Sequence, residues 1–163
     1  MHAILETERL LLRPLQLEDA IFIVELFNSP GWLKYIGDRK ITHKVTAQKY
    51  INSLLENPAI NYTVFILKTT KKPIGIVSLI QRKEESHPDI GFSILPQFSG
   101  KGYTFEASQA FLKAHCNKEK HENIIAFTKP TNAKSIQLLK KLGLQYTGNF
   151  QKNDELLSYF SLK

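Results

Sequence analysis

The chain has 163 residues, 42% of them hydrophobic and 23% charged, which are the length and composition of one globular domain. Its formal net charge is +7. The basic residues are scattered, however, and no basic-aromatic motif of an RNA-binding sheet occurs, so we do not expect a nucleic-acid partner. No window approaches 18 apolar residues, no secretory signal pattern is present, and Cys116 is the only cysteine. We therefore expect a single domain over residues 1–163, in the cytoplasm and without membrane contact.

The spacing of apolar residues and the turn residues between them predict the secondary structure in chain order. Strands are predicted where β-branched and aromatic residues cluster or alternate with polar ones, and helices where apolar residues recur every three to four positions. The run Asn28-Ser29-Pro30-Gly31 is predicted to end the first helix, and Thr46 to cap the second. The predicted strands cover residues 7–13, 61–68, 74–80, 89–95, 123–128, 146–150 and 156–162, and the predicted helices cover 18–27, 47–56, 105–115 and 132–142.

The segment from Gln97 to Thr104 joins a predicted strand to a predicted helix. The first amides of a helix have no intrahelical acceptor and lie at the positive end of its dipole, so a phosphate or pyrophosphate can bind there. Gly100 and Gly102 remove side chains that would keep an anion from the backbone, and Lys101 adds a positive charge. The spacing fits neither the P-loop nor the dinucleotide fingerprint. The alternative is an ordinary loop that contains two glycines.

Four segments in this order resemble the RimJ/RimL-type branch of the GNAT superfamily of N-acetyltransferases. They are T-x-R-L-x-L-R-P-L from Thr7, K-x-x-x-x-P-I-G-x-x-x-L from Lys68, L-P-x-x-x-G-K-G-Y-T-x-E-A from Leu95, and N-x-x-S-I-x-L-L-x-K-L-G-L from Asn132. Together they cover nearly the whole chain. The resemblance implies an α/β (α+β) fold in one GNAT-like domain, with a mixed, mostly antiparallel, splayed central sheet and helices on both faces.

The resemblance also implies the activity, which is transfer of an acetyl group from acetyl-CoA to a primary amine. In this family the loop after the strand binds the pyrophosphate, the end of the strand pairs with the pantetheine arm, and an asparagine contacts the arm from the other side. The positions of this chain that match these cofactor-binding roles are Ile94, Leu95, Gln97, Ser99, Gly100, Lys101, Gly102, Tyr103, Thr104, Asn132 and Ser135.

The acid–base residues are less well defined by the resemblance. Asp89 stands just before I-G, where relatives often carry a carboxylate that takes a proton from the amine through water; the alternative is a charged residue at a strand edge. Glu84 and Glu85 are substitutes in the preceding turn, and Glu85 is also expected near the substrate. Leu139 occupies the position of the tyrosine that many members use to protonate the leaving thiolate. Ser135 is expected either to hydrogen-bond the sulfur as a catalytic group or only to support its helix.

Trp32 and Tyr35 follow the first predicted helix, where the family has one wall of its acceptor site; packing under a loop is the alternative for both. An α-amine titrates near pH 7.7–8.0 and a lysine side chain near 10.4, so a weak acid–base set favours an α-amine. The leading prediction is therefore acetylation of protein N-termini. The alternatives are acetylation of a small-molecule amine or amino-sugar and, from another class, a non-catalytic CoA- or RNA-binding module. A monomer and a homodimer are both compatible with the sequence.

No metal site is predicted. The histidines lie far apart and lack the spacing of metal ligands. They are His2, His43, His87, His115 and His121.

Overall fold

The computed structural model describes residues 3–116 and 123–162. Its strands form one eight-stranded sheet in the order β1-β2-β3-β4-β5-β6-β8-β7. The strands are β1 (Leu5–Glu6), β2 (Leu10–Pro14), β3 (Ile60–Leu67), β4 (Lys72–Ile80), β5 (Asp89–Ile94), β6 (Ile125–Thr128), β7 (Leu144–Lys152) and β8 (Glu155–Leu162). The helices are η1 (Leu17–Asp19), α1 (Ala20–Phe27), α2 (Pro30–Tyr35), α3 (Lys44–Leu55), η2 (Pro96–Phe98), α4 (Tyr103–His115) and α5 (Ala133–Lys141).

Three helix starts differ from the sequence predictions. Helix α1 ends at Phe27, as the stop signal over residues 28–31 predicted, but Pro30 then begins α2, which was not predicted; a proline at the first helical position has no amide that needs an acceptor. The cap of α3 is His43, whose Nδ1 accepts the amide of Thr46 at 3.4 Å, so the prediction of Thr46 as the cap was wrong. Helix α4 begins at Tyr103, because Gly102 adopts a left-handed φ of 83° and serves as its N-cap.

The sheet is mixed and splayed, as predicted. Strands β1 to β5 pair with their neighbours in antiparallel fashion, whereas β5 and β6 run parallel. Within the described residues, β5 and β6 pair at Asp89 and Ile125, and the amide of Ile125 donates to the carbonyl of Pro88 at 3.1 Å. Beyond this point β5 stays paired with β4 as far as Ile94, while β6 diverges. The edge of β5 that faces β6 is therefore open toward the end of the strand.

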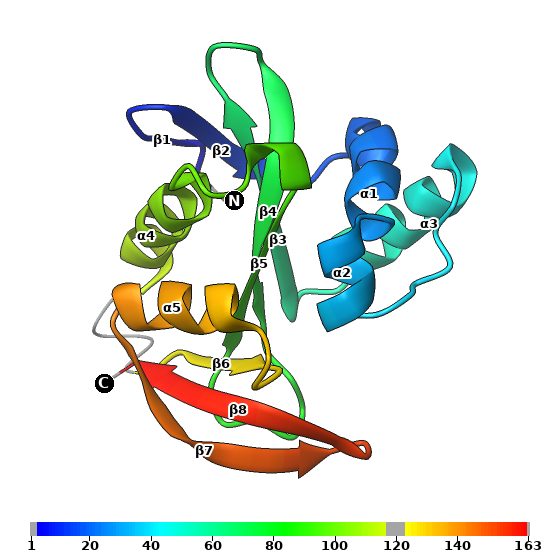
Figure 1. The fold of residues 1–163 in the computed structure, drawn as a ribbon. Helices are drawn as coiled ribbons and strands as arrows, with labels where there is room; N and C mark the ends of the chain where they lie inside the picture. The colour runs from blue at the N-terminus through cyan, green and yellow to red at the C-terminus, as the bar shows by residue number, and fades with distance from the viewer. Residues whose placement is uncertain (1–2, 117–122, 163) are drawn as a thin grey trace.

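Helices cover both faces of the sheet, with α1 to α3 on one side and α4 and α5 on the other (Figure 1). Each face has its own hydrophobic core. The core beneath α4 and α5 includes the fully buried rings of Phe65, Phe111 and Phe160. The opposite core includes Phe27 and Ile51. Because β5 lies in the sheet between these layers, both faces hold it in place and thereby position the loop that follows it; the strand is buried at its start and half-buried toward the loop.

Gly75 in β4, the glycine of the P-I-G segment, lies where no side chain fits. A Cβ at this position would lie 2.1 Å from Cζ of Phe65 and 2.6 Å from the carbonyl oxygen of Ser93. The Phe65 ring therefore packs directly across the bare backbone of Gly75. Across the described ranges, 3–116 and 123–162, no helix has the length and hydrophobicity that a membrane span requires.

Candidate active site

The segment between β5 and α4 contains two residues in the left-handed region, Gly100 with φ 79° and Gly102 with φ 83°. Residues other than glycine rarely adopt this backbone conformation. A Cβ at Gly100 would meet no atom within 4 Å, so conformation rather than space requires glycine there. The amide of Glu106 donates to the carbonyl of Gly102 at 3.0 Å. The amides that come before Glu106 at the start of α4 have no intrahelical acceptor and can bind an anion.

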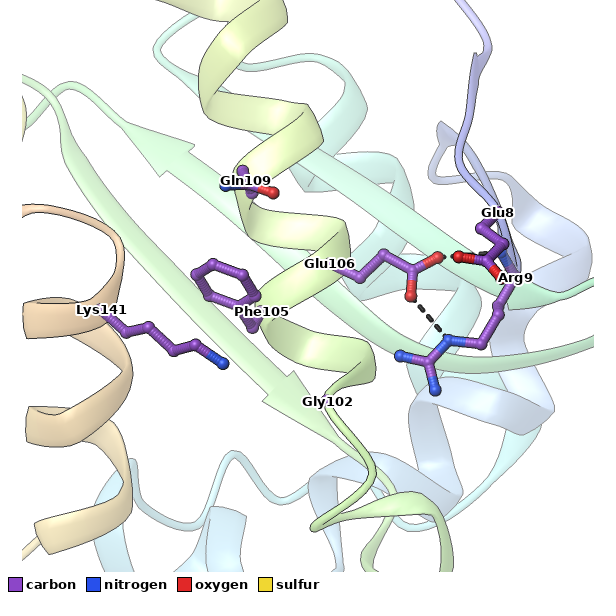
Figure 2. A pocket seen from close by; sticks show the side chains of 7 residues that line it. All are labelled: Glu8, Arg9, Gly102, Phe105, Glu106, Gln109 and Lys141. Atoms are coloured by element: carbon purple, nitrogen blue, oxygen red, sulfur yellow. Dashed lines mark hydrogen bonds and ion pairs between the residues drawn. The ribbon is translucent and has the colours of Figure 1, made fainter.

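A pocket of about 320 Å³ lies beside this helix start. Figure 2 shows Arg9 on one side of the first turn of α4 and Lys141, from α5, on the other. The ammonium of Lys141 lies 4.1 Å from the centre of the Phe105 ring. Sequence analysis did not assign these three residues, because nothing in their local patterns shows that they meet. The lining residues are Glu8, Arg9, Gly102, Phe105, Glu106, Gln109 and Lys141.

Glu106, in the first turn of α4, has a carboxylate that accepts several hydrogen bonds. It accepts hydrogen bonds from the Thr7 hydroxyl at 2.6 Å, the Arg9 amide at 2.9 Å and the Arg9 Nε at 2.7 Å. Burial by itself raises the pKa of Glu106, but the hydrogen bonds from Thr7 and Arg9 and the charge of Arg9 outweigh it, so that the pKa is lowered. Glu106 is therefore ionised at neutral pH, and the positive charge of Arg9 balances its negative charge.

Asp89 is the first residue of β5 and lies where β5 and β6 diverge. Its side chain is 8% exposed and is paired with Nε of Arg82, which is 40% exposed. Burial raises the pKa of Asp89 above its ordinary value; Arg82 and Lys152 oppose this shift, and the charge of Glu85 adds to it. A carboxylate with a raised pKa is suited to act as a general base near neutral pH.

The two substitute carboxylates lie in the turn between β4 and β5. Glu84 is exposed and forms an ion pair with Lys152 at 3.2 Å. A backbone hydrogen bond and the hydrogen bond from Lys152 lower the pKa of Glu84, which makes it a weaker base than Asp89. Glu85 is half-buried, and its charge acts on Asp89. Its place near a substrate remains a prediction.

Asn132 caps α5, and its Oδ1 accepts the amide of Ser135 at 3.3 Å. This contact fixes the carbonyl side of the Asn132 amide. Ser135 thus takes part in the first turn of α5 through its backbone, while a contact between its hydroxyl and a sulfur stays a prediction. Leu139 is 1% exposed in the core, so a buried apolar side chain occupies the position of the family's tyrosine.

The expected acceptor-side residues have different surroundings. Trp32 is 3% exposed and stacks on Phe27 with ring centres 3.9 Å apart, which is a packing role; any contact with a substrate stays a prediction. Tyr35 is half-buried at the end of α2. Gln97 donates its side-chain amide to Glu25 of α1 at 3.1 Å, and its contact with the cofactor stays a prediction.

The family model of the acetyltransferase (GNAT) domain matches residues 9–145. The chain belongs to the GNAT acetyltransferase family. It is 30% identical over 146 residues to the uncharacterized N-acetyltransferase YnaD of Bacillus subtilis (strain 168), covering 90% of this chain and 85% of that protein. It is 32% identical over 149 residues to the uncharacterized N-acetyltransferase p20 of Bacillus licheniformis, covering 88% of this chain and 83% of that protein.

Solved GNAT structures share the fold. A GNAT-family acetyltransferase from Bacillus anthracis matches with a TM-score of 0.82 and 25% identity over 98% of both chains. Ribosomal-protein-S5-alanine acetyltransferase from Vibrio fischeri matches with a TM-score of 0.82 and 22% identity, over 98% of this chain and 96% of that one. AAC(6')-Ib in complex with paromomycin and acetyl-CoA matches with a TM-score of 0.79 and 18% identity, over 96% and 94%.

This GNAT protein is thus an acetyl-CoA-dependent N-acetyltransferase. Two groups of its candidate site residues lie at opposite ends of β5. Residues 99–104 gather at the start of α4, and Asp89 lies at the other end of a six-residue strand that spans about 17 Å. One ligand can reach both ends only if it is extended, and the open edge of β5 suits such a ligand.

The described residues include no group of three or more His, Cys, Asp or Glu side chains that could hold a metal ion. His2 and His121 lie outside the described residues.

Proposed function

We propose that this protein acetylates the N-terminal α-amine of a protein or peptide. The observation that carries the proposal is the position of Asp89, a buried carboxylate with a raised pKa at the point where the open edge of β5 begins. An activated acetyl group placed there meets a proton acceptor, while the anionic end of its carrier reaches the loop at α4.

The residues of this chain divide the work of binding. The amides at the start of α4 and the charge of Lys101 hold the phosphates of acetyl-CoA, and the backbone near Ile94 pairs with the extended arm along the open edge of β5. The amide group of Asn132 contacts that arm from α5. Acetyl-CoA supplies an acetyl thioester, from which the acetyl group passes to the amine nitrogen as the carbon–sulfur bond breaks.

The acid–base groups favour an α-amine. Asp89 takes the proton that the amine loses, through a water molecule, while Arg82 holds its carboxylate in place. Leu139 is buried in the core, so that position offers no phenol to the leaving thiolate. An α-amine, with a pKa of about 7.7–8.0, is largely neutral at mildly basic pH, whereas a lysine side chain, near 10.4, needs a stronger base.

A small-molecule polyamine or amino-sugar is the second candidate. The observation that favours it is the carboxylate of Glu85, whose charge adds to that of Asp89 at the start of β5. Against it stand the net charge of +7 and the cations of Arg82 and Lys152 at the same place, which repel polycations. The fold does not distinguish the two candidates, because the ribosomal-protein-S5-alanine acetyltransferase and AAC(6')-Ib, which was solved with paromomycin, both share this fold.

The test is release of CoA thiol at one ionic strength with four acceptor classes. They are a peptide with a free α-amine, the same peptide with a blocked N-terminus and an internal lysine, spermine, and an aminoglycoside. We expect the highest kcat/KM for the free α-amine. An aminoglycoside or spermine that exceeds every peptide would replace the proposal by the second candidate. Binding of CoA without transfer to any of the four classes would mean that the acceptor lies outside them, and would overturn the proposal. A cytoplasmic location is part of this proposal.

A further inference from the structure

We propose that Arg9 is a positioning residue for the phosphates of acetyl-CoA, because it holds the Lys101–Gly102 peptide in the orientation that turns the Gly102 amide toward them. This inference rests on the proposed use of the loop as the phosphate site. The contact that carries it is the hydrogen bond from Nη1 of Arg9 to the carbonyl oxygen of Lys101 at 3.0 Å.

The geometry of the peptide bond gives this contact its effect. In a planar trans peptide the carbonyl and the following N–H point in opposite directions. No cis peptide occurs in the part of the chain that the structure describes. The carbonyl of Lys101 is turned toward Arg9, so the amide of Gly102 points away from Arg9. Gly102, which follows this peptide, and Gly100, which precedes Lys101, both have left-handed backbones and no side chains that could hold that orientation.

The guanidinium is itself fixed on three sides. Its Nε donates to Glu106 at 2.7 Å while Nη1 reaches Lys101, and its Cζ lies 4.4 Å from the centre of the Tyr103 ring. A Cβ at Gly102 would lie 3.4 Å from its Nη2. Only a planar fork can serve the carboxylate and the carbonyl at once in this arrangement. A lysine would keep the charge but lose the fork.

Arg9 has a second, electrostatic effect on the same site. Glu106 lies in the first turn of α4, where an ionised carboxylate repels a bound phosphate. The ion pair with Arg9 offsets that charge. Figure 2 shows the guanidinium extending from Glu106 toward the turn at Gly102, so that its charge lies between the carboxylate and the loop. Replacement of Arg9 by a neutral residue therefore removes both the orienting contact and the balancing charge.

The experiment measures CoA binding by calorimetry for the parent, Arg9→Lys and Arg9→Gln, with 3'-dephospho-CoA as a second ligand. We expect Arg9→Lys to weaken binding of both ligands by the same factor of about ten, the effect of one hydrogen bond from a charged group, and Arg9→Gln to weaken it further. KM for acetyl-CoA should rise in parallel, whereas kcat and the KM of the acceptor should stay near those of the parent. If Arg9 only stabilised the fold, its replacement would not raise KM for acetyl-CoA while leaving kcat and the KM of the acceptor unchanged.

Lys68→Gln is the matched control. Lys68 donates to the carbonyl of Thr7 at 2.6 Å, so this change loosens the same N-terminal segment without touching the loop. It should leave CoA binding unchanged, and thermal unfolding confirms that each variant folds. Equal binding by a folded Arg9→Lys or Arg9→Gln protein overturns the inference alone. If the Arg9 variants bind CoA more weakly than the parent but bind 3'-dephospho-CoA equally well, the inference is overturned, because Arg9 then contacts the 3'-phosphate directly. A parent that binds no CoA overturns the proposed function as well.

Discussion

Replacement of Asp89 by asparagine separates the chemical step from cofactor binding. Asparagine keeps the shape of the side chain and an oxygen that can accept from Arg82, but it has no charge and does not take a proton. Loss of a general base lowers turnover by about 10²–10⁴-fold. We expect kcat of Asp89→Asn to fall within this range when every substrate is saturating.

Affinity for CoA should stay unchanged in the same variant. Asp89 and the end of β5 that leads to the phosphate loop lie about 17 Å apart along the strand. At physiological ionic strength the Debye length is about 8 Å, so the charge at Asp89 has little influence on phosphates bound at α4. Calorimetry with CoA measures the affinity, and thiol release measures kcat.

The pH profile adds a second signature. The amine must meet an ionised Asp89, so kcat/KM of the parent should fall as pH drops through the raised pKa of this carboxyl. In Asp89→Asn the limb at this pKa should disappear, whereas the limb that the substrate amine itself gives near pH 7.7–8.0 should stay. Glu84→Gln is the control, because Glu84 is exposed and its pKa is lowered; it should keep the profile of the parent. Turnover of Asp89→Asn within about twofold of the parent at neutral pH would refute the base assignment and direct attention to Glu85.

Three further predictions concern the loop and the fold. Gly102→Val places a β-branched residue at φ 83° and should abolish CoA binding measured by calorimetry, whereas Gly148→Val, at φ 148° with no atom within 4 Å, should leave it intact. Gly75→Ala forces the Phe65 ring to move and should lower Tm by about 3–10 °C in thermal unfolding; an unchanged Tm would contradict the packing described for β4. The pKa of Glu106 is lowered in the folded state, so its stabilising effect is present above the ordinary value of 4.5 and is lost as pH falls through the folded value. As the pH is lowered from 4.5 through the folded value, the Tm of Glu106→Gln should therefore fall less steeply than that of the parent.

Much of the fold could be predicted from the sequence, because the signals are local. Alternation, helical spacing and turn residues act within a few positions, so the helix and strand over residues 105–115 and 125–128 follow from neighbouring residues alone. The same holds for the backbone of the loop, since two glycines between a strand and a helix predict by local geometry a place where an anion can bind. Local signals fail where one residue type serves two purposes. Pro30 belongs to the segment that follows the end of α1 at Phe27 and is also the first residue of α2, and the two residues of β1 are too few to show a pattern.

The tertiary structure decided which side chains meet. Arg9 reaches Lys101 and Glu106, and Arg82 reaches Asp89, only because the sheet order brings the start of β2 beside α4 and the end of β4 beside the start of β5. The burial that raises the pKa of Asp89 has the same origin. Contacts between distant parts of a chain depend on how all its elements pack, and no local pattern specifies them. By itself, the sequence predicted the loop where an anion can bind and the carboxylate at the start of β5; the packing of the sheet determined which charges surround each of them.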